Sequence, residues 1–141
     1  MTHENSHQEN YQVIEAWRDN LPAIIVLNAG LNIEDGKRNY PWLMTIQLPI
    51  RHPTANGLCD RVESERLSDI EDTLLDGIEA AAFLYVGRTT WNSMREVLIY
   101  VQDPDFILVR LRSVLESTGE RKIRVGKRYD PTWTEYGQFR S

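Results

Sequence analysis

The chain contains 141 residues and carries a formal net charge of -5 at pH 7; 41% of its residues are hydrophobic and 26% are charged. A chain of this length can bury most of its apolar surface in one core, so folding requires neither a metal nor a disulfide. No apolar run approaches the ~20 residues of a transmembrane helix, and the polar start lacks the features of a secretory signal. With Cys59 as the single cysteine, these properties exclude a helical membrane protein and predict a cytoplasmic location.

The N-terminal part predicts a tail followed by a β-hairpin. Residues 1–10 have almost no apolar side chains to bury, so we expect a disordered tail ahead of one α+β domain at residues 11–141. Strands are predicted at residues 11–17 and 23–27, and a turn is predicted at residues 19–20 between them.

A loop and a strand are expected next. Residues 28–40 contain Gly30 and the Asp35-Gly36 pair, which are typical of loops. Residues 42–49 alternate between two sets of side chains, and this period predicts a strand with one wet face.

The clearest element is an amphipathic helix that is expected to begin near Arg61. Leu67, Ile70 and Leu74 recur at the spacing that stacks side chains on one helical face. The Asp60 carboxylate can accept from the free amides of the first turn, and Glu63 is expected to reach back toward the cap. The opposite face is acidic and carries Glu65, Asp69, Asp72, Asp76 and Glu79.

A second hairpin follows this helix. Residues 83–86 and 96–101 are rich in aromatic and β-branched side chains, which predict two strands joined by a turn at residues 90–93. Asp103 and Pro104 are typical of the start of a second helix.

The remaining residues predict the end of that helix, a last strand and a short helix. Gly119 is the expected C-terminal residue of the second helix. Ile123 and Val125 alternate with basic residues in a last strand, and residues 130–136 resemble a short capped helix.

From residue 42 onward the predicted order is strand, helix, strand, strand, helix, strand. Two right-handed crossovers with a hairpin between them predict a ferredoxin-like antiparallel sheet (βαββαβ) with its two helices on one face. The N-terminal hairpin would extend or cover this sheet. We expect the helices to cover that single face, which leaves charged surfaces as the means of action.

Several short motifs resemble a known family in their order and spacing. They are Tyr40-Pro41-Trp42, Gly57-Leu58, Ile70-Glu71-Asp72, Tyr85-Val86-Gly87-Arg88, Arg95-Glu96 and Asp130-Pro131-x-Trp133-x-x-Tyr136. Together they resemble a bacterial domain-of-unknown-function family, the one numbered 695, over residues 17–139. The resemblance implies an α+β fold related to the regulator of ribonuclease E inhibitor, and it implies no reaction or ligand. Cys59 stands where the family is expected to have proline.

Arg88 and Arg95 are the first candidates for a ligand site. They flank the predicted turn, and a planar guanidinium binds a carboxylate or phosphate in bidentate fashion. Glu71 or Glu96 could neutralise the two arginines, and in that case they would hold the helix to the hairpin as structural ion pairs.

Two charged surfaces are the alternatives. Asp69, Asp72 and Asp76 could form a solvated face or meet a basic partner, and helical periodicity points Glu71 away from this acidic face. The basic strand could bind RNA, with Tyr129 and Trp133 available for stacking, although charged edge strands also discourage aggregation. Its candidate residues are Lys122, Arg124, Lys127 and Arg128.

Catalytic and metal sites receive little support from the sequence. Cys59 and His52 share a loop, but a third group that would orient the imidazole is not evident. His3 and His7 are four residues apart in a segment with no reason to be helical. The glycines do not match a phosphate-binding spacing, and Trp133 is expected to anchor the terminal turn rather than to bind a cofactor.

We therefore expect a non-enzymatic protein-interaction or regulatory module without a cofactor or a bound metal. Its partner would be a protein, and the overall acidity argues against nucleic acid. The first alternative is a small anionic-ligand binding protein with a site at Arg88 and Arg95. The second is an RNA-associated protein that uses the basic strand.

Overall fold

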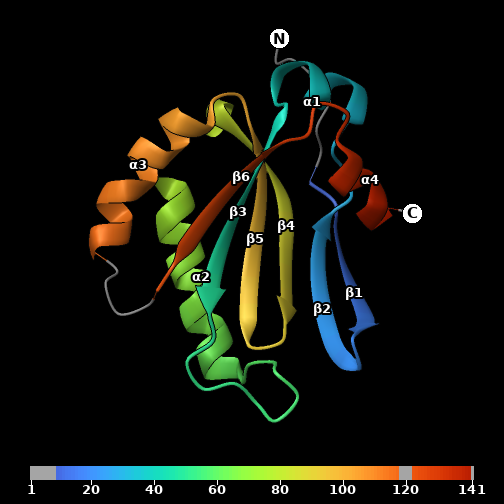
Figure 1. Cartoon of the computed structure of the whole chain (residues 1–141), viewed down its shortest axis with the longest axis vertical. Coiled ribbons are helices and arrows are strands. Elements are labelled where there is room, and N and C mark those ends of the chain that lie inside the picture. Colours follow the sequence, from blue (N-terminus) through green and yellow to red (C-terminus); the bar gives the residue numbers. More distant parts are fainter. Residues whose placement is uncertain (1–8, 118–121, 141) are drawn as a thin grey trace.

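The computed structural model describes residues 9–117 and 122–140. Within these residues it has an α+β fold with six strands and four α-helices (Figure 1). In chain order the elements are β1 (Tyr11–Arg18), β2 (Leu21–Asn28), α1 (Ile33–Asn39), β3 (Trp42–Pro49), α2 (Arg61–Asp76), η1 (Ala80–Ala82), β4 (Phe83–Trp91), β5 (Met94–Val101), α3 (Pro104–Ser117), β6 (Arg124–Tyr129) and α4 (Thr134–Arg140). The expectation of a disordered tail falls mainly on residues 1–8, and the expected helix end at Gly119 also lies outside the described residues.

All six strands form one antiparallel sheet with the order β1-β2-β4-β5-β3-β6. The N-terminal hairpin joins the sheet through β2, which pairs with β4. The two tight turns of the sheet have left-handed backbone at Asp19-Asn20 and Asn92-Ser93, a geometry that matches the twist of paired strands. Both turns lie where the sequence predicts them.

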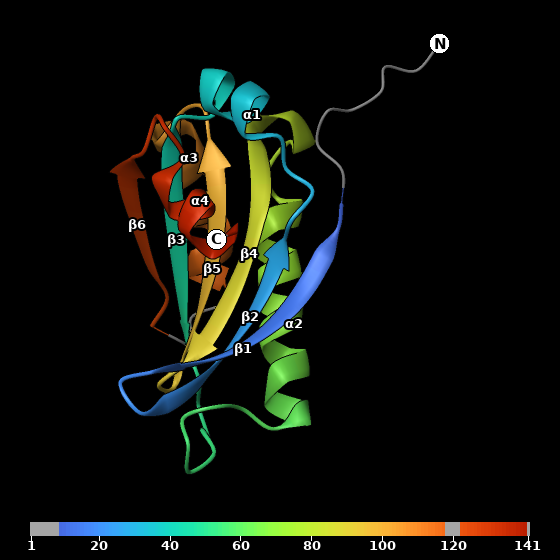
Figure 2. The same ribbon diagram turned by 90° about the vertical axis from the view of Figure 1, so that its right-hand side faces the viewer.

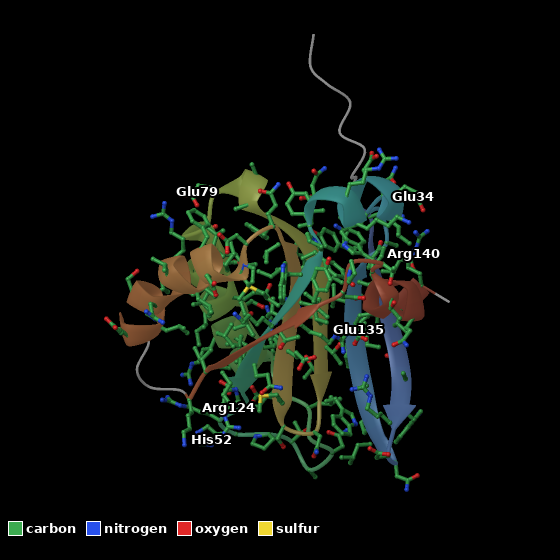
Figure 3. All side chains as sticks on the ribbon, turned by 45° about the horizontal axis from the view of Figure 1, so that its top comes forward. Glu34, His52, Glu79, Arg124, Glu135 and Arg140 are labelled. Carbon is green, nitrogen blue, oxygen red and sulfur yellow. The ribbon has the colours of Figure 1, made fainter. Side chains whose placement is uncertain are left out.

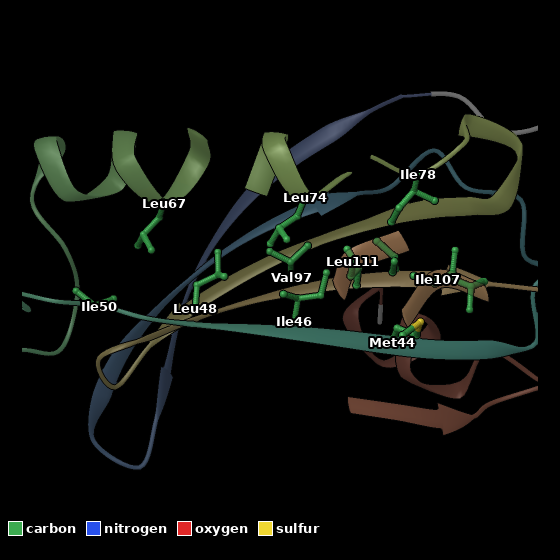
Figure 4. Close-up of a cluster of buried hydrophobic side chains, with 12 residues drawn as sticks. Met44, Ile46, Leu48, Ile50, Leu67, Leu74, Ile78, Val97, Ile107 and Leu111 are labelled. Atoms are coloured by element: carbon green, nitrogen blue, oxygen red, sulfur yellow. The ribbon is translucent and has the colours of Figure 1, made fainter. Parts of the chain in front are cut away.

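One face of the sheet carries the larger core, which α2 and α3 cover. Leu67 and Leu74 from α2 and Leu111 from α3 pack against Ile46 and Val97 of the central strands (Figure 4). The periodic apolar stripes of both helices therefore face the sheet, as the sequence predicts.

The opposite face carries α1 and α4, so the expectation that helices cover a single face is wrong (Figures 1 and 2). The central strands are apolar on this face as well, with Leu43, Leu98 and Tyr100 buried, and these side chains require cover. Trp133 stacks on Tyr100 with ring centroids 4.2 Å apart, and Tyr136 packs edge-on against Trp133. The wet face expected for β3 is therefore partly covered: Leu43 is buried, and Thr45 and Gln47 are half-buried.

A buried carboxylate fixes α4 on this face. Asp130 accepts from the Tyr100 hydroxyl at 2.7 Å and from the amides of Thr134 and Glu135 at 3.0 and 3.1 Å. Burial alone would raise the pKa of Asp130, but these hydrogen bonds outweigh it and hold the pKa below its ordinary value of 3.8. The Tyr136 hydroxyl donates to the carbonyl oxygen of Asn28 at 2.7 Å, and this bond ties α4 to the end of β2.

Residues 28–40 contain α1, so the prediction of an uninterrupted loop is wrong. Asn32 caps this helix by accepting from the Asp35 amide at 3.2 Å. Gly36 suggested a turn, yet it is buried within α1. The Trp133 ring occupies the space that a side chain at this position would need. A tertiary contact therefore explains the glycine.

Candidate functional site

The loop before α2 positions the helix through two acidic residues. Asp60 caps α2 by accepting from the Glu63 amide at 2.8 Å, which confirms the predicted cap. The Glu63 carboxylate is buried and accepts from the Arg51 amide at 2.6 Å. Glu63 therefore fastens the end of β3 to the first turn of α2.

A β-bulge in β4 decides which side chains face α2. Tyr85 pairs with Ile99 of β5 and Gly87 pairs with Leu98, so Val86 is an extra residue between them. In a regular strand, residues 85 and 88 would point to opposite faces, because side chains alternate. The bulge shifts this alternation by one residue, and Tyr85 and Arg88 both face α2.

Glu71 is the acceptor at the centre of this arrangement. Its Oε2 accepts from the Tyr85 hydroxyl at 3.2 Å and from Arg88 Nη1 at 3.5 Å, and it forms an ion pair with Arg88. Its Oε1 is buried and accepts no hydrogen bond from the described residues. Burial raises the pKa of Glu71 above its ordinary value, although Arg88, Tyr85 and Arg95 oppose this effect.

Arg95 clamps α2 to the β4–β5 hairpin. Its guanidinium donates to Thr90 Oγ1 at 3.3 Å, to the Ser64 hydroxyl at 3.0 Å and to Ser68 Oγ at 3.3 Å, and it contacts Cys59 Sγ at 3.8 Å. The ion pairs of the described residues do not include Arg95, and burial is the main cause that lowers its pKa.

The predicted pair of arginines is therefore brought together but differs in exposure. Arg88 donates to the same Ser68 hydroxyl at 3.4 Å, so the two guanidinium groups meet at one serine. Arg95 is buried, whereas Arg88 keeps 27% of its side chain exposed. Glu96 pairs with neither arginine in the described structure; it accepts from Gln47 at 3.1 Å on the other face.

A cavity of about 420 Å³ lies beside this cluster, between α2 and the strands β1, β2 and β4. Glu71, Asp72 and Asp76 of α2 contribute carboxylates to its lining, and Arg88 contributes the one guanidinium. Glu71 and Asp72 line the same cavity, although successive side chains of a helix point about 100° apart. The rest of the lining is apolar or aromatic and consists of Tyr11, Val26, Leu75, Phe83 and Tyr85.

The cavity borders, at Tyr11, a face of the N-terminal hairpin that exposes three large apolar side chains together with Glu15. Val13 of β1 pairs with Val26 of β2, which pairs with Arg88 of β4, so these side chains share the face on which α2 lies. Val13 is 69% exposed, Trp17 is 76% exposed and Tyr11 is 48% exposed. We call these three residues the hairpin patch. Figure 1 shows the hairpin at the edge of the sheet away from α3, with α4 beside its upper end.

The three aspartates of the predicted acidic face are exposed, and the ion pairs of the described residues do not include them. Asp72 and Asp76 line the cavity, whereas Asp69 does not. The flanking acids are paired: Glu65 binds Arg61 at 3.2 Å, and Glu79 binds Arg110 of α3 at 2.7 Å. The unpaired charges of Asp72 and Asp76 therefore lie beside Tyr11, at one end of the hairpin patch.

The predicted basic strand distributes its charges over both faces of β6. Lys127 pairs with Asp105 of α3 at 3.1 Å, while Arg128 pairs with Glu135 of α4 at 3.3 Å, on the opposite side of the sheet. Lys122 and Arg124 are exposed. Figure 3 shows Arg124 near His52, at the end of the molecule away from Glu79.

The remaining candidates do not form a catalytic or metal site within the described residues. Cys59 is half-buried, and its contact is Arg95; His52 is exposed in the loop between β3 and α2. No group of three or more His, Cys, Asp and Glu side chains that could hold a metal occurs among residues 9–117 and 122–140. His3 and His7 lie outside these ranges. Within them, no helix is long and apolar enough to cross a membrane.

Sequence reasoning found Glu71, Arg88 and the aspartates but missed the aromatic residues beside them. Tyr85 follows Phe83 and Leu84 in a run that is typical of a buried strand, so the sequence predicts that it belongs to the hydrophobic core. Trp17 is predicted as a strand residue. Its exposure was not predicted, because it depends on which strands α2 covers. The Tyr85-Val86-Gly87 sequence carries the one available signal, since glycine inside a strand is typical of a bulge.

Comparison with known proteins gives one match. The model of a family described as "Family of unknown function (DUF695)" matches residues 9–140. No curated protein and no solved structure matches the chain.

Proposed function

Because the chain belongs to this family of unknown function, its activity must be argued from its surface, and we propose that it is a non-enzymatic protein-interaction module of the bacterial cytoplasm. Its docking surface would be the hairpin patch together with the acidic side of α2. The partner segment would be both apolar and basic.

The observation that carries this proposal is the exposure of large apolar side chains beside unpaired acids. Tyr11, Val13 and Trp17 expose large apolar side chains along one face of β1, although the exposed Glu15 lies between Val13 and Trp17 on that face, and exposed apolar groups of this size are typical of interaction surfaces. Tryptophan and tyrosine also contribute much of the binding energy at protein interfaces. Burying Val13 alone would contribute roughly 1.5–3 kcal/mol, since that is the typical value for a valine side chain.

Asp72 and Asp76 add charge complementarity to this apolar surface. They border the patch on the α2 side and have no ion-pairing cation among the described residues. Such charges steer encounter and select a partner of opposite sign. A basic amphipathic helix is the segment that fits, because it could lie beside α2 and cover β1 and β2 in the way that α2 covers β4.

The ferredoxin-like arrangement is part of the same proposal. Within the sheet, β4-β5-β3-β6 are neighbours in this order, α2 connects β3 to β4, and α3 connects β5 to β6. This connectivity supports a βαββαβ unit to which β1, β2, α1 and α4 are additions. The docking surface then belongs to an addition, the hairpin, and not to the unit itself.

The alternative functions receive less support from the geometry. For an anion site, Arg95 is buried with its donors occupied and Arg88 is already paired with Glu71. For an RNA site, Lys127 and Arg128 point to opposite faces and are each paired with a carboxylate.

The proposal is tested by co-purification of partner proteins from a lysate of the native host. Bound proteins are quantified by mass spectrometry for the wild type and for the double variant Asp72→Lys/Asp76→Lys. We expect the double variant to lose the partner, and we expect wild-type binding to weaken between 50 and 300 mM salt, because exposed charges are screened. Trp17→Ala should weaken binding about tenfold, which corresponds to ~1.4 kcal/mol.

The matched control is Glu34→Lys/Glu116→Lys, which makes the same change in net charge on exposed positions of α1 and α3. The control should retain the partner. Equal capture by the wild type, the cavity-side double variant and Trp17→Ala would show that this surface is not the docking site.

A further inference from the structure

We infer that the cavity between α2 and the N-terminal hairpin binds one cationic side chain, a lysine or an arginine, that the docking segment of the protein partner inserts against Glu71. This inference rests on the proposed function and specifies how that surface recognises its partner. It is argued from the buried carboxylate, the remaining charges and the shape of the cavity.

The first argument is the unequal use of the two oxygen atoms of Glu71. The residue is 94% buried, since only 6% of its surface is exposed. Tyr85 and Arg88 both donate to Oε2, and none of the described residues donates to Oε1. A buried carboxylate oxygen without a donor is costly to retain. Because Oε1 is itself covered, a donor from the partner would reach it only after the side chains over it move aside.

The second argument is the charge of the lining. Three carboxylates face one guanidinium, which leaves a net negative charge in the cavity when all four groups are ionised. Arg88 is engaged by Glu71 and by Ser68, and Asp72 and Asp76 remain for a cation. An entering ammonium or guanidinium group would therefore meet carboxylates at the mouth and Glu71 in the interior.

The third argument concerns the kind of cation. The acidic side chains do not form a group that could hold a metal ion within the described residues. Instead, Val26, Leu75 and Phe83 offer apolar surface to an alkyl stem, and the rings of Tyr11 and Tyr85 can lie against the charged end. A volume of about 420 Å³ is within the range of small-ligand sites and accommodates a single long side chain.

The experiment uses the full chain and two small probes, n-butylammonium and n-butylguanidinium, which mimic the ends of lysine and arginine. Binding is followed by NMR shifts of backbone amides, with butyrate as the anionic control. We expect saturable shifts at Glu71, Asp72 and Tyr85 for at least one cation and no saturable shifts for butyrate. The probe with the lower dissociation constant identifies the preferred side chain.

Two variants of α2 separate the cavity from general surface charge. Glu71→Gln keeps the shape and an acceptor but removes the buried charge, and it should weaken cation binding at least tenfold. Asp69→Asn removes one charge from the same helix outside the cavity and should change affinity less than twofold. If Glu71→Gln is unfolded, Leu75→Trp, which fills the cavity, replaces it and should abolish the shifts.

Several results would overturn the inference. Shifts that do not saturate by 50 mM, equal binding by the wild type and Glu71→Gln, or shifts centred on Asp69 would mean that water or diffuse surface charge satisfies the site. This failure differs from failure of the proposed function. A partner that is lost from Trp17→Ala but retained by Glu71→Gln would leave the docking surface in place and remove only the cation pocket.

Discussion

Replacing Gly87 by alanine should loosen the junction between the N-terminal hairpin and the rest of the sheet. Gly87 has φ +152°, a backbone conformation that L-residues rarely adopt, and it forms the end of the bulge in β4. An added Cβ would lie 2.1 Å from the carbonyl oxygen of Val26 in β2. The substitution therefore acts on the pairing that carries the docking surface.

The expected cost follows from these two features. The gap of 2.1 Å must widen to at least 3.0 Å, and such a movement stretches neighbouring β2–β4 hydrogen bonds beyond useful length. Strained backbone costs about 1–3 kcal/mol and overpacking about 1–3 kcal/mol. Together they amount to roughly 2–6 kcal/mol, a large part of the 5–15 kcal/mol of a typical domain.

Urea unfolding and amide hydrogen exchange measure this effect. We expect Gly87→Ala to lower the free energy of unfolding and to reduce protection in β2 more than in β3 and β5. Gly137→Ala is the matched control, because Gly137 lies within α4 and nothing lies within 4 Å of the added Cβ. The control should be neutral or gain about 0.5–1 kcal/mol. A Gly87→Ala variant within ~0.5 kcal/mol of the wild type would refute the reasoning.

Three further substitutions test the second face and the buried acid. Gly36→Ala places a Cβ 2.0 Å from the Trp133 ring, so urea unfolding should show a loss of about 1–3 kcal/mol; an unchanged midpoint would mean that α1 can move freely. Asp130→Ala removes the α4 cap and the acceptor of the Tyr100 hydroxyl, and should cost about 2–4 kcal/mol at neutral pH. Because the pKa of Asp130 is depressed, this deficit should shrink as the pH falls below 3.8, and a deficit independent of pH would contradict the hydrogen-bond assignment. Glu71→Gln removes a carboxylate whose pKa burial raises above 4.5, so the folded wild type binds this proton more tightly than the unfolded chain. The wild type should therefore lose stability relative to Glu71→Gln as the pH rises above 4.5 in thermal unfolding; the opposite trend would show that the arginines outweigh burial.

The location of α1 illustrates how a local signal can be present and still be misread. Asn32, Glu34 and Lys37 form a cap, an acidic first turn and a basic last turn, and this pattern is typical of a helix. The prediction of a loop gave more weight to Gly30 and the Asp35-Gly36 pair than to this helical pattern. The packing of Gly36 against Trp133, 97 residues later in the chain, gives the physical reason for that glycine.

The sequence by itself determined the elements whose stability is local. The Asp60 cap, the apolar period of α2, the Asp103 start of α3 and the two Asn-containing turns all lie where the sequence predicts them, because hydrogen bonds and side-chain periods within a few residues specify them.

Only the tertiary structure decided which side chains meet. The bulge at Val86 turns Arg88 toward Glu71, and this orientation depends on pairing between strands that the residue types do not reveal. The exposure of Trp17 depends in the same way on how far α2 extends across the sheet. Interactions between residues close in the sequence therefore determined α2, α3 and the two turns. The pairing of distant strands and the position of α2 on the sheet determined that the buried Glu71 lies near the exposed side chains of the N-terminal hairpin.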